Sequence, residues 1–427
     1  MEFLRAALGI LFFIVVGWLA SSNRKIIQWR LVATGIGLQI FIGVMVLKVG
    51  FIRDAFISIG YGFTTFIGYA RNGTQFLFGK LGVFGEPIGF VFAFQVLPII
   101  VFFSAVTAGL YYLNVLQKLV YGIAWVMSKT MKLSGAETLS ASANIFLGQT
   151  EAPLLVKPFV KTMTTSELNC LMTGGMATLA GSVMASYISM LGGGNPDVEA
   201  RFAAYFLTAS IMNAPAALVF SKMLVPETEK INTKLEVSKE SLGVNLIDAV
   251  STGAADGLKL ALNVGGMLIA FIAIVAFMNG ILDWVGNWSG LNLAIKNYTN
   301  NIFEGLSLQY LFGILGQPFA WMMGVDWNES LVVGSLLGQK TAINEYIAYD
   351  SLTKFKAVEG LLSPKSILIA TFALCGFANF SSIAIQIGGI GGMAPERQSD
   401  ISKLGIKALI GGSLATFLSA TIGGALF

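Results

Sequence analysis

The stretch from Asn144 to Pro153 carries the side chains best suited to chemistry, and it reads Asn-Ile-Phe-Leu-Gly-Gln-Thr-Glu-Ala-Pro. Glu151 stands in this apolar region with no lysine or arginine within one helical turn. A carboxylate at membrane depth costs at least about 2.5–3.5 kcal/mol unless a partner compensates its charge. We interpret Glu151 as a hydrogen-bond acceptor for a polar substrate or as a site for a coupling ion. The alternative is an ion pair with a distant cation.

A second polar stretch, 327–360, contains Glu345 directly after Asn344, and the same two interpretations apply to this carboxylate. Glu137 and Glu329 lie nearer the ends of their apolar segments, so a functional role is less favoured for them. The sequence therefore places one candidate carboxylate in each half of the chain.

Amide and hydroxyl side chains accompany these carboxylates. Taken singly, Asn144, Gln149 and Asn379 are explained as interhelical hydrogen bonds, each worth about 0.6 kcal/mol. However, Thr178 and Asn379 occupy matching places in two apolar segments that glycine and small polar residues interrupt. Interrupted helices free backbone carbonyls, and hard cations such as sodium prefer oxygen ligands. Together the four residues favour a binding site.

Composition identifies the environment of these residues. Of 427 residues, 55% are hydrophobic and only 12% are charged, about half the charged share of a soluble domain. The net charge of +4 comes from scattered Lys and Arg, which gives no footprint for nucleic acid. Two cysteines are too few for a disulfide framework. The sequence has no phosphate-binding loop, which argues against a nucleotide-hydrolysing pump. The chain is predicted to be an all-α polytopic membrane protein.

Eight apolar segments reach the length of about 20 residues that a membrane-spanning helix needs. The first has no clear cleavage site, so we interpret it as a span and not as a signal peptide. The predicted spans are 2–20, 31–52, 87–113, 168–190, 203–224, 258–280, 365–387 and 405–427.

Three other apolar regions do not fit as simple spans. The stretches 133–163 and 327–360 are too polar for lipid and too apolar for loops, which suits re-entrant helical hairpins whose tips line a cavity. We place 307–324 at the membrane interface, because a further span there would put both hairpins on the same side. Lys and Arg in the short loops favour N- and C-termini on the outer side.

The two halves of the chain echo each other. Leu147-Gly-Gln149 recurs as Leu337-Gly-Gln339, and the segment from Gly175 recurs from Gly376. In the predicted topology the two units are inverted relative to each other, which is the plan of many secondary transporters with a midplane site. An intramembrane enzyme would need a nucleophile or metal constellation that the sequence lacks, and a passive channel would need one continuous polar stripe.

These motifs resemble the concentrative nucleoside transporter family in its eight-span bacterial form, over essentially the whole chain. The resemblance is carried by Gly-Gln-Thr-Glu-Ala-Pro at 148–153, by Asn344-Glu345 before an aromatic residue, and by the run 375–382. Pro-Glu-Thr-Glu-Lys at 226–230 and Ala-Leu-Asn-Val-Gly at 261–265 also match. The resemblance implies an elevator-type homotrimer in the inner (plasma) membrane that imports uridine-like nucleosides with sodium, and it implies no enzymatic activity.

The resemblance also implies roles for particular residues. It assigns the nucleobase to Gln149, Thr150, Glu151 and Val183; the ribose to Glu345, Asn379 and Ser382; and apolar contacts to Phe377 and Leu262. It assigns sodium to the side chains of Asn144 and Thr178 and the backbone carbonyls of Leu147 and Leu179. Thr178 departs from the serine expected there, although both carry a hydroxyl. The retained Asn144 favours sodium over protons, and proton coupling is the alternative.

The resemblance further divides the chain into a scaffold and a mobile transport region. Residues 1–132 are predicted to be scaffold, and 133–224 the first transport repeat. Residues 225–324 are predicted to hold a cytoplasmic linker, a scaffold helix and an outer interfacial helix, and 325–427 the second transport repeat.

Overall fold

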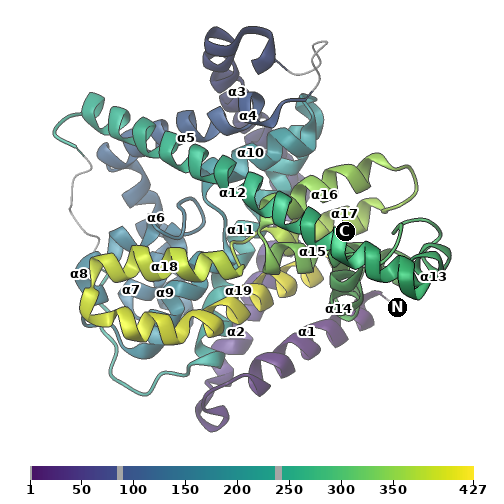
Figure 1. Cartoon of the computed structure of the whole chain (residues 1–427). Helices are drawn as coiled ribbons and strands as arrows, with labels where there is room; N and C mark the ends of the chain where they lie inside the picture. The colour runs from purple at the N-terminus through teal and green to yellow at the C-terminus, as the bar shows by residue number, and fades with distance from the viewer. Residues whose placement is uncertain (1, 84–89, 236–242) are drawn as a thin grey trace.

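A computed structural model describes residues 2–83, 90–235 and 243–427, and its regular elements are helices throughout these ranges (Figure 1). The longer helices are α1 (Glu2–Leu19), α2 (Trp29–Lys48), α3 (Gly50–Phe78), α5 (Leu97–Tyr112), α6 (Val115–Met131), α9 (Thr165–Ala177), α10 (Gly181–Gly192), α11 (Pro196–Leu224), α12 (Leu246–Ser289), α14 (Leu308–Met322), α15 (Trp327–Ala342), α16 (Glu345–Ala357), α17 (Pro364–Leu374), α18 (Phe380–Met393) and α19 (Gln398–Leu426). Shorter helices are α4 (Phe92–Gln95), α7 (Gly135–Ala143), α8 (Lys157–Val160) and α13 (Leu291–Tyr298).

Seven helical stretches of the described residues are long and apolar enough to cross a membrane. They are Glu2–Leu19, Trp29–Lys48, Phe92–Tyr112, Thr165–Gly192, Pro196–Leu224, Leu246–Ser289 and Pro395–Leu426. Each overlaps a predicted span. The remaining predicted span, 365–387, consists of the two shorter apolar helices α17 and α18. The structure therefore confirms a multi-pass helical membrane protein, and the count of eight crossings stays a prediction.

Helix α12 is much longer than the span of 258–280 expected from hydropathy. It runs for 44 residues because Asn245 caps its N-terminus by accepting from the backbone amide of Asp248, while Gly290, with φ of 75°, ends it in the left-handed conformation. At 1.5 Å per residue such a helix is about 66 Å long, roughly twice the thickness of the hydrocarbon core. Hydropathy detects only the apolar middle of such a helix.

Both predicted hairpins are pairs of helical arms around a short tip. In hairpin 1, α7 leads to an irregular tip, and the chain returns through a 3-10 turn, Ala152–Val156, and α8. In hairpin 2, α15 and α16 flank a tip made by Ile343 and Asn344. The Asn344 side chain caps α16 by accepting from the backbone amide of Ile347 at 3.0 Å, which fixes where the second arm begins.

The two interrupted spans are also present. The first breaks between α9 and α10 at 178–180, and the second between α17 and α18 at 375–379. Asn379 ends the second break, because its Oδ1 accepts from the backbone amide of Ser382 at 2.8 Å and so starts α18. The small and polar residues predicted to break these helices therefore do so.

The two breaks meet inside the molecule. The backbone amide of Phe377 donates to the carbonyl of Thr178 at 3.3 Å. A Cβ atom at Gly376 would lie 2.8 Å from the carbonyl oxygens of both Met176 and Ala177, so only glycine allows this approach. Asn213 on α11 joins the two repeats, because its Nδ2 donates to the carbonyls of Ala177 at 2.9 Å and of Cys375 at 2.8 Å.

Asn213→Ala should lower the stability of the folded protein by about 2 kcal/mol, because two buried carbonyls lose their shared donor. Ser210→Ala, one turn earlier on α11, removes only a weak 3.7 Å contact with the Cys375 thiol and is the matched control. The measurement is the midpoint of thermal aggregation of the purified protein in detergent. Equal midpoints for the two variants would contradict the role of Asn213.

Helix α14 covers the segment 307–324 and packs closely along α15, the first arm of hairpin 2. Its predicted place at the membrane interface stays a prediction. Small residues allow this contact, since a Cβ at Gly316 would lie 2.3 Å from the carbonyl oxygen of Gly334. The predicted boundary between the region 225–324 and the second transport repeat, 325–427, therefore falls between two helices that pack together in the structure. The division into scaffold and transport regions stays a prediction.

The acidic residues at the hairpin mouths have structural partners. Glu137 is buried, shares a capping box with Ser134, and pairs with the ammonium group of Lys222. Lys222 also binds Glu227 at 3.0 Å; burial alone would raise the pKa of Glu227, but this cation holds it below its usual value. Glu329 accepts from the backbone amide of Ser363 at 3.1 Å and so helps to cap α17. These contacts explain Glu137 and Glu329 without a functional role.

Candidate binding site at the two helix breaks

Glu345 is the centre of a buried hydrogen-bond network. It is the first residue of α16, and only 4% of it is exposed. Its Oε2 accepts from Nδ2 of Asn379 at 2.9 Å, and its Oε1 accepts from the hydroxyl of Tyr187 at 2.9 Å. Hairpin 2, the second helix break and α10 therefore converge on one carboxylate.

The network extends from Asn379 to hairpin 1. The backbone amide of Ser382 donates to Oδ1 of Asn379, and the Ser382 hydroxyl accepts from Nε2 of Gln149 at 3.1 Å. Gln386 on α18 donates from Nε2 to Oε1 of Gln149 at 3.1 Å and to the carbonyl of Met172 at 3.0 Å. Residues assigned to the nucleobase and to the ribose by the resemblance are thus linked through one chain of bonds.

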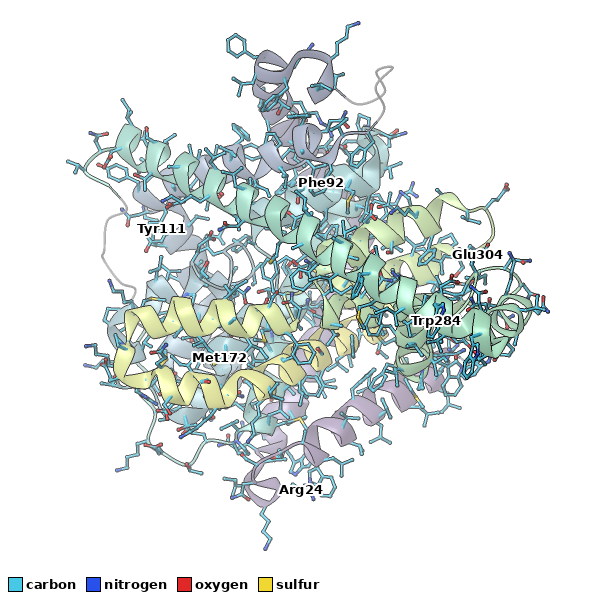
Figure 2. The ribbon with its side chains drawn as sticks, in the orientation of Figure 1. Arg24, Phe92, Tyr111, Met172, Trp284 and Glu304 are labelled. Atoms are coloured by element: carbon cyan, nitrogen blue, oxygen red, sulfur yellow. The ribbon has the colours of Figure 1, made fainter. Side chains whose placement is uncertain are left out.

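Thr150 and Glu151 lie beside this network and line a cavity of about 360 Å³. The opposite wall comes from α5 and α12, with Ser104, Tyr111 and Asp256 among the lining residues. Figure 2 shows Tyr111 beside the first half of α12. Glu151 accepts a bond from the backbone amide of Gly148 at 2.8 Å, which folds the tip of hairpin 1 around it. A cavity of this volume accommodates a small polar molecule.

Asn144 has the properties of a cation ligand. It is fully buried, and neither Oδ1 nor Nδ2 has a hydrogen-bond partner within the described part of the chain. A Cβ at Gly174, in the last turn of α9, would lie 3.0 Å from Asn144 Nδ2. Thr178 directly follows this turn, with its hydroxyl donating to the carbonyl of Gly174 at 3.0 Å. An unpaired buried amide is costly, and an ion bound by oxygen atoms at the end of a half-helix would satisfy its Oδ1.

The other residues that the resemblance assigns to sodium or to the substrate differ in their burial. Leu147 and Leu179 are buried at the hairpin tip and the first break, where the backbone amide of Gly181 donates to the carbonyl of Phe146. Val183 is buried in the first turn of α10, and Phe377 is half-buried at the second break. Leu262 is 66% exposed on α12, and its assignment to the site stays a prediction.

Tyr187 and Gln386 belong to the hydrogen-bond network, and sequence reasoning missed both. Gln386 could have been noticed as a lone amide within the predicted span 365–387. Tyr187 had no such signal, because a tyrosine in an apolar helix is usually a packing residue. Its bond to Glu345 depends on contact between residues from opposite halves of the chain.

The fold and the site together define a class of protein. Two hairpins and two interrupted helices surround a polar network inside a helical membrane protein. Half-helix ends and hairpin tips near the midplane are the binding elements of secondary transporters.

Comparison with known families identifies the group. Residues 205–424 match the family described as "Na+ dependent nucleoside transporter C-terminus", and 8–81 match "Na+ dependent nucleoside transporter N-terminus". Residues 93–194 match a family described as "Nucleoside recognition". The chain belongs to the sodium-dependent, concentrative nucleoside transporter family, whose coupling ion is sodium.

Individual relatives agree with this assignment. An uncharacterized transporter of Haemophilus influenzae is 43% identical and covers 99% of this chain and 98% of its own length. Sodium/nucleoside cotransporter 1 of Mus musculus is 40% identical over 98% of this chain and 63% of its own. The structure of CNTnw in an inward-facing, substrate-bound state is 42% identical, with a TM-score of 0.89 and coverage of 100% of this chain and 98% of that chain. A CNTnw variant in an outward-facing state is 41% identical, with a TM-score of 0.90 and the same coverage.

Proposed function

We propose that this protein is a symporter that imports uridine-like nucleosides with the sodium gradient. Membership of the sodium-dependent family supports nucleoside symport and a transporter, not an enzyme. The single observation that carries the proposal is the buried network from Gln149 to Glu345, because it supplies mixed donors and acceptors at one end and a carboxylate beside an amide at the other.

In the proposed complex the nucleobase binds to hairpin 1 and the ribose to hairpin 2 and the second break. Gln149 and Glu151 match the donors and acceptors of a base edge, with Thr150 and Val183 beside them. The ribose hydroxyls exchange hydrogen bonds with Glu345, Asn379 and Ser382. Phe377 contacts an apolar face of the nucleoside. Leu262, exposed on α12, would add an apolar contact from the helix whose residues Asp256 and Leu260 line the same cavity as Glu151.

Sodium is proposed to bind between Asn144 and Thr178, with the carbonyls of Leu147 and Leu179 completing an oxygen cage. The unpaired Asn144 amide supports this placement. The same hairpin tip carries Gln149 only five residues later, so an ion that orders the tip also orders the base-binding side chains. This short connection would make nucleoside binding depend on sodium.

The transport cycle is proposed to be an elevator movement of the two hairpins and broken helices against a fixed scaffold, in a homotrimer in the plasma membrane. The scaffold would include α12, which exposes apolar residues along most of its length, Trp284 among them (Figure 2). Such a surface suits lipid and a neighbouring subunit. The termini are proposed to lie on the outer side.

Radiolabelled uridine uptake into proteoliposomes should be driven by an inward sodium gradient and not by a matched proton gradient. The physical reason is the oxygen-rich Asn144 site, which suits a metal cation. Accumulation driven by protons alone would keep the nucleoside assignment and move the coupling to Glu151 or Glu345. No accumulation of uridine, cytidine or adenosine under either gradient would contradict the proposed substrate class.

A further inference from the structure

The hydrogen bonds around Glu345 leave part of the acceptor capacity of its carboxylate unused. A carboxylate accepts about four hydrogen bonds, roughly two on each oxygen. Tyr187 bonds to Oε1 and Asn379 to Oε2, both at 2.9 Å, so each oxygen has one side-chain donor. Two side-chain donors on different oxygens fix the plane of the carboxylate, and part of its acceptor capacity is still unused. Two adjacent hydroxyl groups of a ribose fit that arrangement.

We propose that Tyr187 is a positioning residue that orients the Glu345 carboxylate toward the ribose diol. In this role it makes the site select ribonucleosides over nucleosides that lack the 2′- and 3′-hydroxyls. This inference rests on the proposed function, in which Glu345 binds the ribose. Tyr187 acts through Glu345 and touches no part of the substrate itself.

The surroundings of Tyr187 prevent its hydroxyl from pointing elsewhere. The side chain is fully buried, and its ring centroid lies 4.6 Å from that of Tyr346 and 4.5 Å from that of Tyr349. The neighbouring phenols have partners of their own. Tyr346 shares a 2.9 Å bond with Ser186, and Tyr349 donates to the carbonyl of Thr371 at 3.0 Å. Among these three packed tyrosines, Tyr187 is the one that donates to Glu345.

The bond also connects the two repeats. Tyr187 belongs to α10, which follows the first helix break, whereas Glu345 begins the second arm of hairpin 2. Asn379, the other donor, belongs to the second break. The carboxylate is therefore aligned only when the hairpin, the second break and α10 are in contact. A hydrogen bond to a charged group in a buried site is among the stronger ones, so its loss should be measurable.

Tyr187→Phe keeps the ring and removes only the hydroxyl, and Tyr349→Phe makes the same change at a tyrosine that bonds to the backbone. Sodium-driven uptake of uridine and of 2′,3′-dideoxyuridine is measured in proteoliposomes, after size-exclusion chromatography has shown that each variant is folded. In Tyr187→Phe, the apparent KM for uridine should rise about 10-fold. The KM for dideoxyuridine and the half-saturating sodium concentration should change less than about twofold. Tyr349→Phe should retain the parent preference for uridine.

Each other outcome identifies what has failed. If the parent protein does not prefer uridine over dideoxyuridine, Glu345 does not bind the ribose, and the proposed site is wrong. If the parent has the preference and Tyr187→Phe retains it, only the role of Tyr187 is wrong. Equal losses for both nucleosides, or the same selective loss in Tyr349→Phe, would mean that the hydroxyl supports packing and does not position Glu345.

Discussion

Glu345→Gln should lower uridine uptake at low substrate concentration about 100-fold while the protein stays folded. The carboxylate accepts from Tyr187 and from Asn379 at the same time, and in the proposed function it also accepts from the ribose. An amide has one acceptor oxygen, and its NH2 group would face one of these donors. Loss of charge-assisted bonds worth about 1.5–3 kcal/mol each is enough for a change of this size.

The control is Glu359→Gln, which makes the same change at an exposed residue between α16 and α17. Its uptake should equal that of the parent within experimental error. Initial rates in proteoliposomes under an inward sodium gradient give the comparison, and size-exclusion profiles of both variants show whether the fold is intact. If folded Glu345→Gln takes up uridine within about threefold of the parent rate, Glu345 does not bind the substrate.

Asn144→Ala should raise the half-saturating sodium concentration for uptake at least about 10-fold. The substitution removes a buried oxygen from the proposed cation cage, and the amide it removes has no protein partner to lose in the described part of the chain. The KM for uridine at saturating sodium should stay within about threefold, because the base and ribose contacts remain. Sodium titrations of uridine uptake at constant ionic strength make the measurement.

Asn169→Ala is the matched control for the cation site. Asn169 is also fully buried in the first repeat, but its Nδ2 donates to the backbone carbonyl of Ser221 at 3.0 Å. Its removal should affect stability and leave the sodium curve in place. A sodium curve for Asn144→Ala that coincides with the parent curve would show that the ion binds elsewhere.

The membrane class and the main helical elements were predictable from local patterns. Apolar length identifies spans because the hydrocarbon core has a fixed thickness. Polar residues inside the stretches 133–163 and 327–360 predicted re-entrant hairpins, since backbone at membrane depth must be buried or line a cavity. In the structure each stretch holds helical segments around a short tip. The small and polar residues around Thr178 and Asn379 similarly identified both helix breaks, which the structure contains. Carboxylates inside apolar stretches marked Glu151 and Glu345 as candidates, and the structure buries Glu345 in a hydrogen-bond network.

The local patterns did not determine how helices pair. Hydropathy gave no sign that α12 continues to Ser289 or that α14 packs along α15, because polar helix ends and interhelical packing leave no apolar signal. The resemblance assigned Leu262 to the site, yet its exposure depends on where α12 stands relative to the hairpins.

Only the tertiary structure decided which polar groups meet. Glu345 and Tyr187 are 158 residues apart, and Gln149 and Gln386 are 237 residues apart, so their spacing carries no information about their hydrogen bonds. Asn213 joins the two breaks for the same reason, through contacts between α11 and both repeats. The amino-acid sequence determines which groups cannot face lipid, because desolvation is a property of each residue and its neighbours. Their partners depend on how distant helices pack.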